Sequence, residues 1–169
     1  MVKNISERKL NRLLELNKKL VLEDDFSKKI DLISKSVKDI IKADRCTIFI
    51  HDNSTKSLWS VYVDGISFIE VPSNMGIVSE VYNTKKTMVV NDCQNNPKFN
   101  SDVDKGTGYT TKAILSVPIL GYADIPLGVI QLINKLDGTE SFQEDDEEVV
   151  HYVMAHISAF LEIMIQKDE

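Results

Sequence analysis

The sequence predicts an α+β fold in which an antiparallel sheet of six strands lies between helices. The apolar pattern runs in the order helix, helix, three strands, a segment of helix, short strand and loop, two strands and a final helix. Short turns join the early strands and the last two strands, which is typical of antiparallel neighbours. The strands are apolar at nearly every position, which indicates that both faces of the sheet are covered.

The N-terminal part of the chain is expected to form two amphipathic helices. In residues 4–22, leucines recur at the spacing of one helix face: Leu10, Leu13 and Leu20. Asn17 lies within this stripe, either as a partly exposed side chain or as a polar residue that sets the register of a helix pair. The second helix follows a capping pair, Asp24–Asp25, and its apolar face consists of Phe26, Ile30, Ile33, Val37 and Ile40.

Residues 45–52 are predicted to form the first strand, whose side chains alternate between two faces. One face carries Cys46, Ile48 and Ile50, and the other carries Thr47, Phe49 and His51. Residues 58–63 form the second strand, and Asp64–Gly65 is a turn signal that leads into a returning strand over residues 67–71. Pro72 is expected to end that strand.

The segment 76–111 is expected to cover one face of the sheet, and the long helices the other. Gly76 begins a short helix, and residues 87–90 form a short strand. Residues 91–108 are polar, with a short helix expected over residues 100–105. An irregular segment of this length inside a compact domain is usually functional.

The C-terminal part is predicted to contain two strands and the last helix. Residues 113–120 form a strand in which Pro118 marks an edge or a bulge, because proline has no amide hydrogen for the ladder. A helix over residues 141–166 is expected to begin at Ser141, with Glu144 reaching back to complete a capping box.

The loop between the last strand, residues 127–133, and this helix has a lysine at one end and carboxylates at the other. An ion pair between Lys135 and Asp146 is the expected closure, and an exposed pair would contribute about 0–1 kcal/mol. Phe142 is expected to fill the core beneath the loop.

These residues resemble the signature of a known family. Asn134-Lys135, then Phe142, then three residues and Asp146-Glu147 are similar to the NKxnFx3DE signature of GAF domains. Other segments follow the family's order: Gly76-Ile77-Val78, Asn96-Pro97-Lys98-Phe99, Asp104, Thr107-Gly108-Tyr109, Thr111, Ile114-Leu115 and Pro118-Ile119. The resemblance covers about residues 10–165 and is greatest to the regulatory GAF domains of cyclic-nucleotide phosphodiesterases and bacterial signalling proteins. It implies a six-stranded antiparallel sheet with a ligand beneath the insertion.

The resemblance also implies a ligand-binding set: Thr47, Val63, Asp64, Ile77, Val78, Asn100, Thr107, Thr111 and Gln131. A cyclic nucleotide would place its base by Asp64 and above Thr47. Its phosphate would lie on the first-turn amides of the helix that Gly76 begins. Its ribose would lie near Thr107 and Thr111, which are spaced like residues one helical turn apart.

Three residues depart from the family's binding pattern, and several have a simpler interpretation. Val63 stands where several relatives carry an aromatic side chain, Asn100 stands where relatives often have tyrosine, and Gln131 is the third departure. Thr47 and Gln131 are equally explained as polar groups that satisfy each other or bind water. Asp64 fits a turn aspartate, and Gly76 fits a plain N-cap.

The composition is that of an ordinary globular protein, and 169 residues are enough for one domain. The net charge of −6 argues against a nucleic-acid partner. Cys46 and Cys93 lie far apart and form no CxxC motif, which favours a reducing, cytoplasmic setting. The N-terminus lacks the apolar core of a signal peptide, and no uninterrupted apolar run approaches the ~20 residues that span a membrane.

Catalytic and metal-binding residues are not expected. His151 and His156 are five residues apart and therefore do not share a helix face as metal ligands would. His51 stands alone, and the carboxylates gather in the first turn of the last helix, where the helix dipole explains them.

We therefore expect residues 1–169 to form one sensory domain of a signalling protein. It would bind a small molecule, cyclic AMP or cyclic GMP as the best candidate, without a required cofactor. It would form a homodimer through residues 4–22 and 141–166 and pass the signal to a C-terminal output domain. The alternative is an orphan domain that only dimerises. A third class, an enzyme resembling free methionine sulfoxide reductases, would need clustered cysteines.

Overall fold

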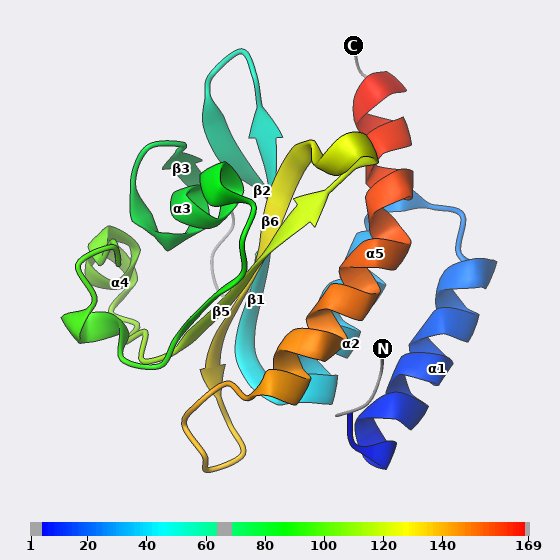
Figure 1. Cartoon of the computed structure of the whole chain (residues 1–169), viewed down its shortest axis with the longest axis horizontal. Coiled ribbons are helices and arrows are strands. Elements are labelled where there is room, and N and C mark those ends of the chain that lie inside the picture. The colour runs from blue at the N-terminus through cyan, green and yellow to red at the C-terminus, as the bar shows by residue number, and fades with distance from the viewer. Residues whose placement is uncertain (1–4, 64–68, 168–169) are drawn as a thin grey trace.

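The chain forms three layers, with the sheet in the middle. The computed structural model describes residues 5–63 and 69–167. The strand order is β3-β2-β1-β6-β5-β4, and neighbouring strands are antiparallel. Helices α1, α2 and α5 cover one face, and α3 and α4 lie on the other (Figure 1). The predicted α+β fold with a six-stranded antiparallel sheet is confirmed.

The elements have these bounds: α1 Glu7–Leu22, α2 Phe26–Ile41, β1 Ala43–Asp52, β2 Ser57–Val63, β3 Glu70–Pro72, α3 Gly76–Thr84, β4 Met88–Val90, α4 Asp102–Thr107, β5 Ile114–Leu120, β6 Pro126–Lys135 and α5 Glu144–Lys167. Short 3-10 turns occur at Cys93–Asn95 and Tyr122–Asp124. The helix predicted over residues 100–105 is present, two residues further along.

The leucine stripe of α1 is used for packing within the chain. Ser6 caps the helix by accepting a hydrogen bond from the Lys9 amide, so α1 begins at Glu7 rather than at residue 4. Leu13 and Leu16 are both 3% exposed and belong to the core on the helix-covered face. The stripe was expected to serve a dimer; most of it instead contacts the same molecule. Asn17 is partly buried, and its side-chain amide donates to the Tyr152 hydroxyl of α5 at 3.5 Å, so it lies between two helices of the same chain.

The core on this face is built from branched aliphatic side chains of the helices and of the sheet. Val37 and Ile41 of α2, Ile130 of β6 and Leu161 of α5 are completely buried there. Asp25 caps α2 through the Lys28 amide at 2.9 Å, which confirms the predicted capping pair. Burying such side chains contributes about 1.5–3 kcal/mol each, so this face supplies much of the stability.

Strand pairing confirms the predicted faces of β1 and fixes the polar residues of the sheet. Thr47 of β1 is opposite Gln131 of β6, and Gln131 is opposite Ser116 of β5. Directly paired residues point to the same face, so these three side chains form a row on the side of α3. Pro118 lies beyond the short pairing of β4 with residues 114–116, which confirms the predicted edge position.

Two predicted boundaries are wrong. Of the described residues, Ile69 is outside the returning strand, and β3 includes Pro72, which pairs with Ser57; the predicted turn at Asp64–Gly65 and the first residues of the predicted strand lie outside the described residues. Helix α5 begins at Glu144 and not at Ser141. The capping carboxylate belongs to Asp146, which accepts a hydrogen bond from the Gln143 amide at 2.8 Å. Asp146 therefore takes the role predicted for Glu144, and it also forms the ion pair with Lys135.

Helix α5 has the length and composition of a membrane span, although no uninterrupted apolar run suggests one. Within Glu144–Ile165, an 18-residue window has a mean hydropathy of 1.4, and 33% of that window is buried inside the molecule. The apolar side chains that give this value include Val149, Val150 and Leu161, which lie in the core against the sheet. Core helices have this composition for the same reason, since their apolar side chains pack against other elements.

Gly128 of β6 is required by the close approach of the β1 backbone. A Cβ atom at this position would lie 2.0 Å from the Phe49 carbonyl oxygen. We expect Gly128→Ala to lower the free energy of unfolding by about 1–3 kcal/mol or more, because backbone atoms must move. Gly106→Ala in α4, where no atom lies within 4 Å, is the control and should be neutral or stabilising by up to about 1 kcal/mol. Urea unfolding of both variants checks this; equal destabilisation would contradict it.

Candidate ligand pocket and buried ion-pair network

A pocket lies between the sheet and the insertion that contains α3 and α4. It has a volume of about 790 Å³, part of which is open to solvent. Its floor comes from β1 and β6, and its walls come from β3, α3, α4 and the segment that leads into β5. The lining residues are Arg45, Thr47, Phe49, Ile69, Val71, Gly76, Ile77, Val78, Phe99, Asn100, Asp104, Thr107, Tyr109, Thr111, Ile114, Gln131 and Ile133.

The fold brings seven of the nine predicted ligand residues into this one pocket: Thr47, Ile77, Val78, Asn100, Thr107, Thr111 and Gln131. They come from β1, α3, α4, β6 and two loops. Val63 pairs with Thr47 at the end of β2, but its side chain, like Asp64, lies outside the described part of the structure. The role of these residues in binding stays a prediction.

The start of α3 offers free amides to the pocket. Gly76 has φ +90° and is the first residue of α3, so Met75 rather than Gly76 is the N-cap, without a side-chain hydrogen bond. The first-turn amides at Ile77 and Val78 have no acceptor within the helix. The Ser79 hydroxyl donates to the carbonyls of Pro72 and Met75 and so fixes the helix to β3.

The threonines predicted to act together do not lie on one helix. Helix α4 ends at Thr107, and Gly108 follows with φ +73°, so Thr111 is in an extended segment beyond it. The expected spacing of one helical turn is therefore wrong, although both residues line the pocket. The Thr111 amide and hydroxyl donate to the two oxygens of Asp104 at 2.8 and 2.7 Å, which ties α4 to the strand that follows.

The polar row of Thr47, Gln131 and Ser116, of which the first two line the pocket, is incompletely hydrogen-bonded. The Ser116 hydroxyl is completely buried and has no partner among the described residues. Gln131 lies beside it in the pocket and likewise forms no side-chain hydrogen bond within residues 5–63 and 69–167. The alternative in which Thr47 and Gln131 satisfy each other is not what the structure shows. Buried groups of this kind usually receive a partner from water or a ligand.

Arg45 and Tyr109 complete the wall and were not among the predicted site residues. The Arg45 guanidinium carbon lies 3.6 Å from the centre of the Tyr109 ring. The Tyr109 hydroxyl donates to Asp44 at 2.6 Å and accepts from the Asn134 amide at 2.9 Å. Burial, with the hydrogen bond to Asp44, raises the pKa of Tyr109 well above its ordinary value. The signal for Arg45 was its position two residues before Thr47 on the same strand face.

The predicted ion pair between Lys135 and Asp146 is confirmed, and it is buried. The Lys135 ammonium lies 3.0 and 3.1 Å from the Asp146 oxygens and donates to the Ile41 carbonyl at 2.6 Å. The two side chains are 1% and 0% exposed. The expectation of about 0–1 kcal/mol applied to an exposed pair, so it does not hold here. Phe142, 4% exposed, fills the core beneath the loop as predicted.

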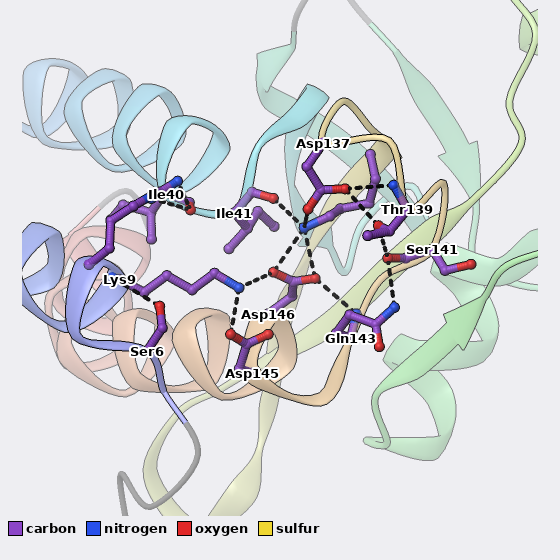
Figure 2. Close-up of polar contacts among 12 residues, drawn as sticks. Ser6, Lys9, Ile40, Ile41, Asp137, Thr139, Ser141, Gln143, Asp145 and Asp146 are labelled. Carbon is purple, nitrogen blue, oxygen red and sulfur yellow. Dashed lines mark hydrogen bonds and ion pairs between the residues drawn. The ribbon is translucent and has the colours of Figure 1, made fainter.

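A second lysine, from α1, enters the same network (Figure 2). The Lys9 ammonium donates to Asp145 at 2.6 Å and to Asp146 at 2.9 Å. Burial alone would lower the pKa of Lys9, but the hydrogen bonds to Asp145 and Asp146 outweigh it and raise that pKa. Lys9 is separated from Asp146 by 137 positions, and no local pattern connects the two.

The loop itself is held by its own residues. Asp137 accepts from the Thr139 hydroxyl at 2.6 Å and lies 3.2 Å from the Lys135 ammonium. The hydrogen bonds from Thr139, together with Lys135, lower the pKa of Asp137 to about 2. Because this folded-state pKa is below the unfolded value, the contribution is present above about pH 4 and is lost as the pH falls toward 2.

Asn134, the neighbour of Lys135, holds the other side of the strand end. It has φ +59°, and its side-chain oxygen accepts from the amides of Lys112 and Ala113 at 2.8 and 3.0 Å. Its side-chain amide donates to Tyr109 and Thr110. Asn134 thus fixes the segment that carries Thr111 into the pocket.

The cysteines lie on opposite faces of the sheet. Cys46 belongs to the core under α2 and α5, and Cys93 to the core under α3; both are free and completely buried. Burial, with the charges of Asp104 and Asp92, raises the pKa of the Cys93 thiol to about 12. A thiol with this pKa is a poor nucleophile at neutral pH.

Comparison with known proteins identifies the family. The model of the GAF domain family matches residues 25–161. This chain is a GAF domain. The domain is regulatory or sensory in signalling proteins such as phosphodiesterases.

The most similar curated proteins are much longer than this chain. A dual cyclic-AMP and cyclic-GMP phosphodiesterase 11A of Takifugu rubripes is 33% identical over 150 residues, which cover 78% of this chain and 17% of that protein. The cone cGMP-specific phosphodiesterase subunit alpha' of Bos taurus is 32% identical over 139 residues, which cover 73% of this chain and 16% of the subunit. The GAF domain thus spans about a sixth of their length.

Solved structures agree in fold. The GAF domain of an Acinetobacter phosphoenolpyruvate-protein phosphotransferase superposes with a TM-score of 0.81 at 17% identity, covering 97% of this chain and 99% of that one. A free methionine-R-sulfoxide reductase of Neisseria meningitidis superposes with a TM-score of 0.76 at 15% identity, covering 98% and 96%. At these identities the likeness shows the fold alone.

Removal of Lys135 should destabilise this GAF domain strongly. We expect Lys135→Ala to cost about 3–5 kcal/mol, because it leaves the Asp146 carboxylate buried with one lysine fewer. Lys35→Ala, which breaks the exposed Asp31–Lys35 pair of α2, is the control and should cost less than about 1 kcal/mol. Chemical unfolding measures both. In a double-mutant cycle with Asp146→Ala, additive effects would show that Lys135 and Asp146 do not interact.

The thiols should be unreactive in the folded protein. Both cysteines are completely buried, so a thiol reagent at pH 8 should label neither within the time that denatured protein needs for complete labelling. Denatured protein should yield two thiols per chain. Rapid labelling of one thiol in the native state would contradict this and would favour cysteine chemistry.

Proposed function

We propose that this GAF domain is a regulatory receptor that binds a small molecule in the pocket between the sheet and α3–α4, with a cyclic nucleotide as the best candidate. The observation that carries the proposal is the convergence of Thr47, Ile77, Val78, Thr111 and Gln131 on one pocket from separate parts of the chain. The curated relatives named as cyclic-nucleotide phosphodiesterases support this choice of ligand.

The chemistry of the pocket fits a compact polar ligand. The first-turn amides at Ile77 and Val78 can receive a phosphate. Thr107 and Thr111 both line the pocket, and their hydroxyl oxygens can accept hydrogen bonds from a ribose. Gln131 presents an amide, with both donor and acceptor capacity, to a base.

The proposal includes an output domain and a route to it. The curated relatives are about six times longer than their match to this chain, which supports a larger signalling protein, and we propose a cytoplasmic one. Helix α5 leaves the domain at its C-terminal end, and its first turn belongs to the network of Lys135 and Asp146. A change at the β6–α5 loop would therefore reach the helix that continues toward an output domain.

A second candidate function is dimerisation without a ligand. Four apolar side chains of α1 remain exposed: Leu10 37%, Leu14 49%, Val21 79% and Leu22 83%. Ile163 near the end of α5 is 56% exposed. These residues, rather than Leu13, would form the interface with a second copy of the chain.

Calorimetry with cyclic AMP and cyclic GMP tests the first proposal. Folded, ligand-free protein should bind at least one of them, and Thr111→Ala should weaken binding by roughly 0.5–1.5 kcal/mol, the net value of one hydrogen bond. Thr87→Ala is the control, because Thr87 bonds His151 on the surface and does not line the pocket. No heat with either nucleotide at millimolar concentration would leave dimerisation as the better candidate.

Light scattering tests the second proposal. A homodimer should dissociate in the double variant Leu14→Glu, Val21→Glu, because both side chains are exposed and their replacement leaves the core intact. Leu13→Glu should instead unfold the domain, since Leu13 is buried. A wild-type protein that is monomeric at high micromolar concentration removes this proposal.

A further inference from the structure

The only cationic side chain that lines the pocket, among the described residues, is Arg45. It lies on β1, two positions from Thr47 and on the same face of the sheet. Within residues 5–63 and 69–167, no carboxylate forms an ion pair with it, and its recorded side-chain contact is the ring of Tyr109. A partly buried guanidinium has five N–H donors to satisfy, so this pocket contains a cation that forms no ion pair within the described part of the chain.

The side chain is held in place by the ring beneath it. Tyr109 is fixed at its hydroxyl by Asp44 on β1 and by Asn134 on β6. A guanidinium stacked on such a ring keeps its edges available, because stacking uses only its face. The edge geometry matches the two oxygens of a carboxylate or phosphate. Part of the entropic cost of ordering this side chain has therefore been met before a ligand arrives.

Among the described lining residues the carboxylate is that of Asp104, and it is already hydrogen-bonded. It accepts from the amide and the hydroxyl of Thr111, whereas Arg45 has no comparable partner. A neutral ligand would leave the guanidinium unpaired in a partly desolvated site, which is unfavourable. An anionic ligand would satisfy it.

We propose that Arg45 is the anion-recognition residue of this pocket and that the ligand carries a phosphate or carboxylate group which docks on the edge of its guanidinium. The inference deepens the proposed function and rests on ligand binding in this pocket. It differs from an anion held by the first-turn amides of α3 alone, because a helix start supplies a partial charge whereas Arg45 supplies a full one. The ligand's charged group then lies toward β1 and Tyr109.

The test compares charged and uncharged ligands on matched variants. Calorimetry is performed with cyclic AMP and cyclic GMP, and with adenosine and guanosine, which lack the phosphate. The variants are Arg45→Gln, Arg45→Lys and, as a control for loss of charge, Arg12→Gln, whose guanidinium lies on the surface of α1 beside Asp39. Circular dichroism and the unfolding midpoint establish that each variant is folded.

Arg45→Gln should weaken the nucleotide by about tenfold or more and leave the nucleoside almost unchanged, because only the phosphate loses its charged partner. Arg45→Lys should recover part of the loss, and Arg12→Gln should bind like wild type. If Arg45→Gln weakens nucleotide and nucleoside equally, or neither, the inference is overturned while the proposed function stands.

A panel of small anions separates this inference from the choice of nucleotide. If no nucleotide binds the wild type, the unfolding midpoint is measured with ribose 5-phosphate, inorganic phosphate and malonate. A rise in the midpoint that Arg45→Gln abolishes supports Arg45 as the anion site, and the probe that acts distinguishes phosphate from carboxylate. No rise with any of the three in the wild type overturns the inference.

Discussion

The fold depends on a buried charge that four segments share. The Asp146 carboxylate receives hydrogen bonds from Lys135 of β6, Lys9 of α1 and the Gln143 amide at the start of α5. Lys135 in turn donates to the last carbonyl of α2, at Ile41. Taking these charges out of water is costly, and only the complete set of partners compensates for it. The strand, three helices and the loop must therefore reach their positions together.

The dipeptide Asn134-Lys135 acts on both faces of the sheet at once. Lys135 points toward the helices and enters the network of Asp146, whereas Asn134 points toward the insertion and holds Lys112, Ala113 and Tyr109. The left-handed backbone at Asn134 allows this change of direction at the end of β6. The pocket wall and the helical layer are consequently bonded to neighbouring residues, so a shift of the backbone at Asn134 also shifts Lys135.

The sequence predicted the layers, the strand faces, the Lys135–Asp146 pair and most of the pocket lining. These features depend on hydrophobic periodicity, on turn residues and on the order of short motifs, all of which are found within short stretches of the chain. Three features could not be predicted. Lys9 joins the network across nearly the whole chain. Helix α5 begins after Gln143 and not at Ser141. The Gln143 amide donates to the buried Asp146 carboxylate, and this hydrogen bond outweighs the local preference of the Ser141 hydroxyl for a cap position. Thr107 and Thr111 were predicted to lie one helical turn apart, but α4 ends at Thr107 because Gly108 adopts a left-handed conformation.

Helix α1 lies outside the segment that the family model matches, yet the matched segment does not close its own core. Residues 25–161 lack Lys9, Leu13 and Leu16, which cover the carboxylates of Asp145 and Asp146 and the apolar side chains of α2 and α5. A domain that began at residue 25 would expose the surfaces of α2 and α5 that α1 covers. It would also leave Asp145 and Asp146 with Lys135 as their nearby lysine. The structural unit of this chain is therefore larger than its family signature, and its first helix is part of the hydrophobic and electrostatic interior.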